Sequence, residues 1–195
     1  MTAMPPGREL ERNGSIGLPL LRNRYRVRDV AGAPVPAGAT GELQVAGPVV
    51  TPGYWDRPDA TAAALTADGW LRTGDAAAID DDGFLTLVDR WKDMYISGGE
   101  NVYPAEVEKA LHEHPAVAQA AVVGAPHPRW GESGVAFVIP AAGADPDPAS
   151  LLAFCAQHLA RYKVPTDVVL LDELPRNATG KVLKAPLRER AAGPA

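Results

Sequence analysis

The chain has 195 residues, of which 46% are hydrophobic and 22% are charged, and its formal net charge is −5. A chain of this size and composition can bury one or two modest cores. The acidic balance excludes a general nucleic-acid binder, because neutralising phosphates requires a basic face and the sequence shows none. No apolar run reaches membrane-spanning length and the N-terminus lacks a signal-peptide pattern, so we expect a cytoplasmic protein.

The first part of the chain carries the signals of short strands. Residues 1–14 contain several turn-forming residues and are expected to be irregular. Residues 59–65 are rich in alanine and predict a short helix. Strands are predicted at residues 24–28, 41–45, 70–79 and 84–88, with a strong turn at residues 80–83. We therefore expect a small β structure up to residue 88.

The second part begins with a charged connector at residues 89–93 and alternates between helices and strands. The helix at residues 104–112 has proline at its first position, and Asp147 is expected to cap the next helix. Further helix signals lie near residues 148–159 and 184–190, and strand signals at residues 117–123, 135–139 and 167–171. A loop at residues 124–128 is expected between the first two of these strands. This alternation predicts an α+β domain at residues 93–195.

Side chains that could ligate a metal or form a disulfide are few. The single cysteine, Cys155, lies in an apolar run and is expected in the core. The histidines have no metal-ligand spacing, so we interpret all four as structural or surface residues: His112, His114, His127 and His158. The sequence therefore predicts no metal site.

A turn of two glycines precedes the helix at residues 104–112. Adjacent glycines adopt positive φ without steric cost and let another molecule approach the backbone. Taken alone, Gly98 and Gly99 would indicate only a tight hairpin leading into a surface helix. The surrounding sequence, Asp-Arg-Trp-Lys-Asp-Met-Tyr-Ile-Ser-Gly-Gly-Glu-Asn-Val-Tyr-Pro-Ala-Glu-Val-Glu at residues 89–108, is far more specific.

This stretch closely resembles the hinge and the following loop of AMP-forming acyl- and aryl-coenzyme A synthetases, which are adenylate-forming enzymes. The motif Ser-Gly-Gly-Glu-Asn-Val-Tyr-Pro is typical of ligases that use free coenzyme A. Two earlier motifs fit the same family in order, Gly-Tyr-Trp-Asp-Arg-Pro at residues 53–58 and Gly-Trp-Leu-Arg-Thr-Gly-Asp at residues 69–75. The resemblance covers nearly the whole chain.

The resemblance implies roles for particular residues. Asp75 would hold the ribose hydroxyls of ATP, as a carboxylate can by charge-assisted hydrogen bonds, and Arg90 would assist it. Lys92 would be the hinge about which a mobile small domain rotates between two half-reactions. The loop that lines the approach of coenzyme A would be formed by Ser97, Gly98, Gly99, Glu100 and Asn101.

A second lysine, Lys181, follows Gly180 in a polar loop. The pattern is not a phosphate-binding P-loop, because Pro175 replaces the earlier glycine and Val182 replaces the Ser or Thr that would touch magnesium. In the coenzyme A synthetases that this chain resembles, the matching lysine bridges the acyl carboxylate and the α-phosphate as they react. A compact, mobile ammonium group suits this catalytic role.

The sequence also departs from the family pattern. It has no Gly/Ser/Thr-rich loop for the pyrophosphate end of ATP and no acyl pocket. Met1 and Thr2 resemble the tail of a Tyr-Gly-x-Thr-Glu motif, but Ala3 stands where the magnesium-associated glutamate is expected. The resemblance thus implies the last β subdomain of a large N-terminal domain at residues 1–88, a hinge at residues 89–92 and a mobile C-terminal domain at residues 93–195. The full enzyme would use magnesium through ligands outside this chain.

We therefore expect part of an enzyme that converts a small carboxylic acid, ATP and coenzyme A to acyl-coenzyme A, AMP and pyrophosphate. This chain alone is expected to be inactive, and to self-associate or bind the missing large domain. Two alternatives stay open: an adenylating domain that loads a carrier protein, and a non-catalytic remnant that binds a partner chain. The acyl substrate is not encoded in these residues.

Overall fold

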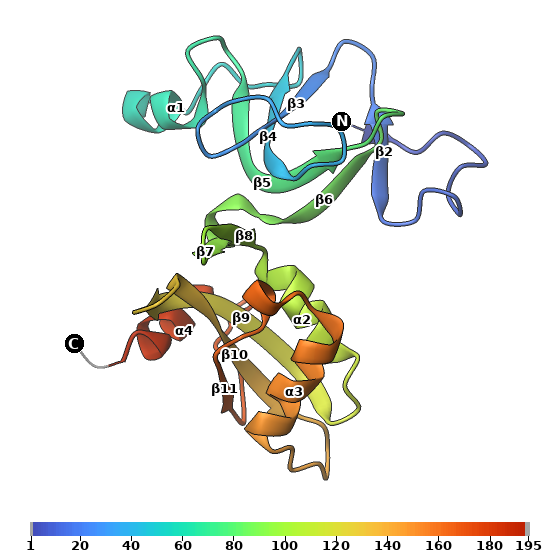
Figure 1. Cartoon of the computed structure of the whole chain (residues 1–195). Coiled ribbons are helices and arrows are strands. Elements are labelled where there is room, and N and C mark those ends of the chain that lie inside the picture. The colour runs from blue at the N-terminus through green and yellow to red at the C-terminus, as the bar shows by residue number, and fades with distance from the viewer. Residues whose placement is uncertain (1, 194–195) are drawn as a thin grey trace. The chain divides into compact units, whose positions relative to one another are not determined.

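The computed structural model describes residues 2–193 and divides the chain into two compact units, Met1–Lys92 and Asp93–Ala195. Met1, which belongs to one of the motif comparisons above, lies outside the described residues. The predicted fold class is confirmed: the first unit is a small curled β structure and the second is α+β (Figure 1).

The first unit is built on an antiparallel sheet with the strand order β1-β2-β6-β5-β4-β3. Its elements are β1 Thr2–Ala3, β2 Ser15–Pro19, β3 Arg24–Arg28, β4 Gly41–Ala46, α1 Pro58–Ala64, β5 Leu71–Ile79 and β6 Leu85–Arg90. The expectation of an irregular start was wrong in one respect, because Thr2 and Ala3 pair with Pro19 and Leu18 of β2.

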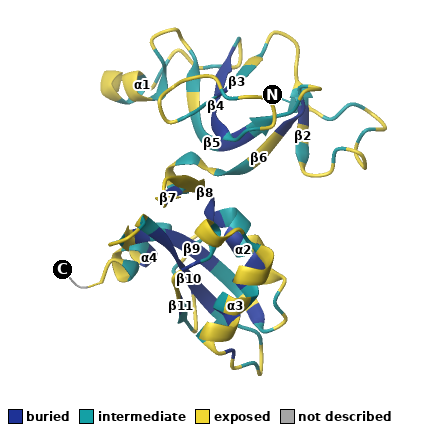
Figure 2. Ribbon diagram, viewed as in Figure 1, coloured by how far each residue is buried: buried dark blue, intermediate teal, exposed yellow. Residues whose placement is uncertain are grey.

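The strand β4 lies between β3 and β5 in this sheet, and all six of its residues are buried. Leu43 and Val45 pack with Ala77 and Leu85 in a small core. In Figure 2, β4 is coloured as buried, whereas the helix α1 has no buried residue. Alanine content and a proline in the first turn therefore account for α1, because packing contributes little to it.

The second unit holds a mixed sheet in which β10 pairs with β9 and β7 antiparallel and with β11 parallel. Its elements are β7 Tyr95–Ser97, β8 Glu100–Val102, α2 Pro104–His112, β9 Val117–His127, β10 Gly131–Pro140, α3 Pro148–His158, β11 Asp167–Leu170 and α4 Lys184–Ala191. Short 3-10 turns occupy Trp91–Asp93, at the junction of the units, and Arg161–Lys163.

The central strands of this sheet are buried on both faces, with α2 and α3 on one face and α4 on the other (Figures 1 and 2). Val122 and Val138 face the cluster that contains Leu111 of α2 and the predicted core residue Cys155 of α3. Their neighbours Val123 and Phe137 point the opposite way, toward Leu187 of α4. This alternation is the period-2 pattern of a strand in a sheet covered on both sides.

Three local predictions need correction. The loop expected at residues 124–128 is mostly strand, because β9 runs on to His127. Among the described residues β9 pairs only with β10, so it is an edge strand. Pro126, which has no backbone N–H to donate, is tolerated there because one side of an edge strand forms no hydrogen bonds to a neighbouring strand. Asp147 is the N-cap of α3, but its side chain makes no capping hydrogen bond; its carbonyl oxygen instead accepts a bond from Ser150 Oγ at 2.6 Å.

The third correction concerns the charged connector. Asp89 and Arg90 are the last residues of β6, paired in register with Ala76 and Asp75 of β5. Only Trp91–Asp93 leave the strand, as a 3-10 turn. Ladder pairing thus extends the strand β6 two residues further than the charge pattern predicted.

Candidate functional site

Asp75 and Arg90 lie side by side in the first unit. They occupy opposing positions on β5 and β6, and Arg90 Nη1 lies 2.8 Å from Asp75 Oδ1. Their side chains are 29% and 51% exposed, so the pair faces solvent. The ion pair uses one carboxylate oxygen and leaves the second able to accept hydrogen bonds from a ligand. The structure therefore brings together the two residues expected at the ribose.

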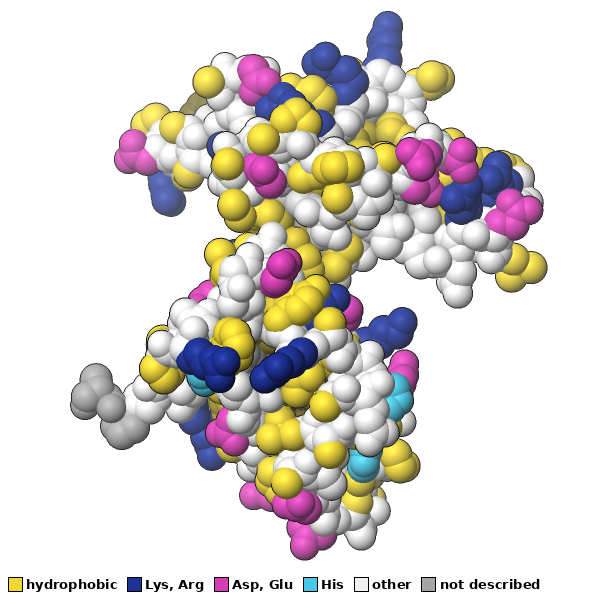
Figure 3. Space-filling model, in the orientation of Figure 1, with side chains coloured by type: hydrophobic (Ala, Val, Ile, Leu, Met, Phe, Trp, Pro, Cys, Tyr) yellow, Lys and Arg dark blue, Asp and Glu magenta, His cyan; other side chains and the backbone are white. Residues whose placement is uncertain are grey.

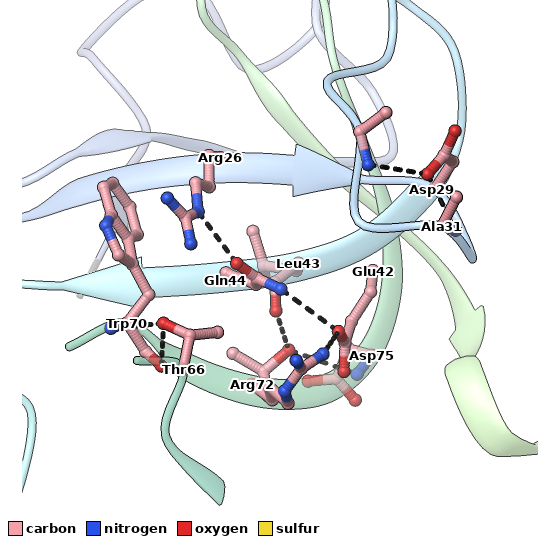
Figure 4. Close-up of polar contacts among 12 residues, drawn as sticks. Arg26, Asp29, Ala31, Glu42, Leu43, Gln44, Thr66, Trp70, Arg72 and Asp75 are labelled. Carbon is pink, nitrogen blue, oxygen red and sulfur yellow. Dashed lines mark hydrogen bonds and ion pairs between the residues drawn. The ribbon is translucent and has the colours of Figure 1, made fainter. Parts of the chain in front are cut away.

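A chain of polar contacts supports the strand that carries Asp75 (Figure 4). Arg72 Nη1 lies 3.0 Å from Glu42 Oε2, and Glu42 in turn accepts a bond from Gln44 Nε2 at 3.3 Å. Thr73 Oγ1 donates to the Leu43 carbonyl at 2.9 Å and accepts the Asp75 amide at 3.1 Å. Sequence reasoning missed this support, although the two polar residues of β4 could have signalled it. The network fixes the backbone of β5 next to Asp75.

Lys181 lies on a tight loop of the second unit, where residues 176 and 182 form an isolated bridge. Asn177 Oδ1 accepts the amides of Thr179 at 3.1 Å and Lys181 at 2.9 Å. Gly180 adopts a positive φ of 84°, which closes the turn at no steric cost. Lys181 itself is exposed, and its ammonium group has no ion pair among residues 2–193. The backbone is thus held while the charged group is free to engage a ligand.

Contacts of two side chains, which the sequence did not predict, hold this loop from both ends. On one side, Arg176 donates to the Gly180 carbonyl and to Gln119 Oε1 of β9, each at 2.5 Å. On the other side, Lys184 Nζ pairs with Glu108 Oε1 of α2 at 2.8 Å. No sequence signal identifies the partners Gln119 and Glu108, because they lie in distant segments of the chain.

The residues 97–101 form a hairpin between β7 and β8. Gly98 and Gly99 have φ of 61° and 90°, the two positive values that a tight two-residue hairpin requires. Gly98 donates to the Trp130 carbonyl at 2.9 Å, and a side chain there would meet the Trp130 ring at 3.0 Å. A side chain at Gly99 would meet nothing within 4 Å. Ser97 is buried, whereas Glu100 and Asn101 are exposed, so the turn presents bare backbone to solvent.

A cavity of about 650 Å³ lies beside this hairpin, within the second unit. Ser97 and Trp130 line it on the hairpin side, and Tyr162 adds a second aromatic ring. Arg129 and Arg161 contribute two guanidinium groups to its lining. Aromatic faces together with arginine suit a ligand that combines a flat ring with anionic groups.

Lys92 is exposed at the middle of the turn Trp91–Asp93. Its neighbour Asp93 pairs with Arg188 of α4 at 2.6 Å. Within residues 2–193, no hydrogen bond or ion pair joins Lys181 to the hairpin at residues 97–101. The sequence-predicted site residues thus fall into four groups: the Asp75–Arg90 pair, Lys92 in its turn, the hairpin and the Lys181 loop.

The described part of the chain contains no group of three or more His, Cys, Asp or Glu side chains arranged to hold a metal ion. None of the helices between residues 2 and 193 is long and apolar enough to cross a membrane.

The chain matches two family models. Residues 1–55 match the model described as AMP-binding enzyme, and residues 106–181 match the AMP-binding enzyme C-terminal domain. The chain is 51% identical over 180 residues to a feruloyl-CoA synthase of Amycolatopsis sp, covering 92% of this chain and 36% of that protein. It is 47% identical over 170 residues to the fatty acid–[acyl-carrier-protein] ligase ScoC of Streptomyces coeruleorubidus, covering 87% of this chain and 33% of that protein.

Solved structures agree with these relatives. The o-succinylbenzoate CoA synthetase of Bacillus subtilis, in complex with its acyl-adenylate intermediate, is 39% identical with a TM-score of 0.84. That match covers 98% of this chain and 39% of the other. The chain therefore spans little more than a third of the length of the proteins that it matches. Its sequence, its fold and the order of its motifs agree in one conclusion: the chain belongs to the AMP-binding family of adenylate-forming enzymes.

Proposed function

We propose that the chain is the C-terminal part of an ATP-dependent acyl-coenzyme A synthetase. Such an enzyme joins a carboxylic acid to ATP as an acyl-adenylate, releasing pyrophosphate, and then transfers the acyl group to the thiol of coenzyme A, releasing AMP. The observation that carries the proposal is the arrangement of site residues at their motif positions, with Asp75 and Arg90 paired at 2.8 Å.

The Asp75–Arg90 pair is proposed to bind the ribose of ATP. The free carboxylate oxygen of Asp75 accepts hydrogen bonds from the ribose hydroxyls, and Arg90 donates to the same sugar. Because the two side chains already pair across β5 and β6, the site is preorganised before the nucleotide arrives.

Lys181 is proposed to act in the first half-reaction. In this step a carboxylate oxygen attacks the α-phosphorus and pyrophosphate leaves. Negative charge then accumulates between the acyl carboxylate and the α-phosphate. The unpaired ammonium group of Lys181, on a loop whose backbone is fixed by Asn177, neutralises that charge. Magnesium is expected in the full enzyme, but the described residues offer no ligand set for it.

The hairpin at residues 97–101 is proposed to act in the second half-reaction. The thiol sulfur attacks the acyl carbonyl carbon of the adenylate and loses its proton to water. A carbon–sulfur bond forms, and AMP leaves with the electron pair of the broken carbon–oxygen bond. Bare backbone at Gly98 and Gly99 admits the narrow pantetheine arm. The adjoining cavity, with Trp130 and Arg129 in its lining, suits the adenine ring and phosphates at the other end of coenzyme A.

The first experiment asks whether the chain works alone. We expect the purified 195-residue chain to show no pyrophosphate exchange with ATP and a carboxylic acid. It should bind ATP no tighter than about millimolar, the affinity that a few contacts supply. Activity should appear when the N-terminal part of a relative such as the feruloyl-CoA synthase is fused or added. Turnover by the chain alone, or no turnover in any such combination, would contradict the proposal.

A second candidate is an adenylating domain that loads an acyl carrier protein. It is favoured by the 47% identity to the ScoC ligase, which equals the identity to a 2-succinylbenzoate–CoA ligase of Geobacillus kaustophilus. The same reconstituted enzyme should be offered coenzyme A and phosphopantetheinylated carrier protein in parallel. Preference for the free thiol supports the first proposal, and preference for the carrier supports the second.

The first unit is also proposed to be covered by another protein surface. Hydrophobic side chains are visible on its surface in Figure 3, and the most exposed large ones are Leu10, Leu21, Val30 and Trp55. Where such side chains form one contiguous patch, they mark an interface. We expect the isolated chain to self-associate, or to bind the N-terminal part of its relatives, in sedimentation experiments. A strict monomer at high concentration would count against this.

A further inference from the structure

The junction between the two units is held on each side by an ion pair. On the N-terminal side, Arg90 ends β6 and pairs with Asp75 in the first unit, at 2.8 Å. On the C-terminal side, Asp93 begins the second unit and its Oδ1 lies 2.6 Å from Arg188 Nη2 of α4. Each pair lies wholly within one unit.

The second pair is the more enclosed of the two. The Asp93 side chain is only 13% exposed and that of Arg188 is 38% exposed. Arg188 directly follows Leu187, which is 2% exposed in the core between α4 and the sheet. The pair therefore ties Asp93 to the helix α4, which is itself fixed by packing. Removing the guanidinium group of Arg188 would leave the largely buried carboxylate of Asp93 without this partner.

The next fixed point along the chain is Tyr95. Its side chain is 2% exposed and packs against the backbone of two strands: a Cβ added at Gly124 or at Gly134 would come within 2.4 Å of it. The Ile96 amide then donates to Glu132 Oε2 at 2.9 Å. Tyr95 is thus anchored in the second core, so a rotation at the junction must be absorbed by residues 91–94.

We propose that Arg188 is a positioning residue that confines the hinge to Trp91 and Lys92. While Asp93 is held by Arg188, any backbone rotation must be absorbed by the two residues between the ion pairs. Without Arg188, the mobile segment extends through Asp93 and Met94 to Tyr95. The functional meaning rests on the proposed hinge role of Lys92, whereas the confinement is a physical property of this chain.

The direct test measures backbone 15N order parameters in the full 195-residue chain. In the parent chain we expect Asp93 and Met94 to have values of about 0.85, as in a rigid backbone. Arg188→Gln should lower both below about 0.6, the flexible range. Arg190→Gln is the matched control, because it removes an exposed arginine from the same helix and should leave both values unchanged.

A second variant guards against damage to α4. Asp93→Asn breaks the same pair without changing the helix, and should loosen Met94 to a similar extent. The double variant should show no further loss, because both changes remove one interaction. If position 93 and Met94 stay rigid in both single variants while hydrogen exchange of β10 is unchanged, the proposal is overturned.

A functional test separates this inference from the proposed hinge. In an enzyme completed with the N-terminal part of a relative, Lys92→Pro should block thioester formation when Arg188 is present. In the Arg188→Gln background the block should be partly relieved, because Asp93 and Met94 can then absorb the rotation. An equal block in both backgrounds overturns the inference. No block in either background overturns the hinge role of Lys92 instead.

Discussion

The two units hold their candidate site residues in different ways. In the first unit, Asp75 and Arg90 stand on neighbouring strands and satisfy one another's charge. In the second unit, Lys181 and the glycines of the hairpin stand on tight turns, and the lysine ammonium group has no ion pair within residues 2–193. The first arrangement is suited to holding a ligand in one place, and the second to groups that engage only during a reaction.

In the second unit, the backbone is held rigid and the reactive groups are left open. Both turns of the second unit have fixed backbones, through Asn177 in one and through Trp130 in the other. Only the ammonium group and the bare peptide surface are left open. The variants below test whether the Asp75–Arg90 pair binds nucleotide and whether Lys181 and the hairpin act in the two half-reactions. Every activity is measured in an enzyme completed with the N-terminal part of a relative.

The largest effect is expected from Lys181→Ala. If the ammonium group neutralises charge only in adenylation, pyrophosphate exchange should fall by a factor on the order of 100 or more. Consumption of preformed acyl-adenylate by the thiol should survive. Lys109→Ala, which removes an exposed lysine from α2, serves as the control. Equal loss of both half-reactions would show that Lys181 is structural.

The next effect is expected from Lys92→Pro. Proline fixes φ and prevents a rotation at this position. Thioester formation should drop by about tenfold or more while pyrophosphate exchange is spared, if domain rotation limits the second step. Loss of exchange as well would indicate that the variant disturbs the fold of the turn Trp91–Asp93 and not its motion.

Gly99→Val tests the open hairpin. Its φ of 90° disfavours a side chain, so we expect a loss of about 1–2 kcal/mol in stability, and in addition a selective loss of thioester formation. Gly143→Val is the matched control: it has a φ of 76°, and a side chain there also meets nothing within 4 Å. Both variants should lose similar stability in denaturant titrations. Thioester formation should fall only at Gly99, and a similar fall at Gly143 would assign the effect to strain.

Asp75→Asn tests the paired site. It keeps the shape of the side chain but replaces charge-assisted hydrogen bonds by neutral ones, so nucleotide affinity should fall about tenfold. Asp68→Asn breaks another arginine pair in the same unit, with Arg26, and should leave affinity unchanged. Calorimetric titration with ATP measures both, and unchanged affinity in Asp75→Asn would remove Asp75 from the ribose site.

The smallest effect concerns pH and the second unit alone. Burial raises the pKa of Tyr95, and the nearby Glu132 carboxylate raises it further. The pKa of Tyr95 in the folded chain is therefore above its value of about 10 in the unfolded chain. The stability that the protonated phenol contributes is fully present below pH 10. Above pH 10 the free energy of unfolding falls, by up to about 1.4 kcal/mol for each pH unit. Tyr95→Phe should remove that dependence in unfolding experiments. A parent and a variant with identical profiles would contradict this.

The residues alone were enough to predict the α+β class, the helix at residues 104–112 and the two-glycine turn. These features depend on local signals: proline at a first helical position, period-2 alternation and positive-φ glycines. Each is encoded within a few residues, so one sequence is enough to predict it. The motif order added the candidate residues Asp75, Arg90, Lys92 and Lys181, whose roles remain predictions.

Which side chains meet becomes visible only in the folded chain. The pairing of Asp75 with Arg90 depends on the register of two strands, including the irregularity between Ala76 and Ala77. The contact between Asp93 and Arg188 joins positions 95 residues apart. Periodicity shows which face a residue occupies, but it does not identify the partner, because register and packing depend on the whole sheet.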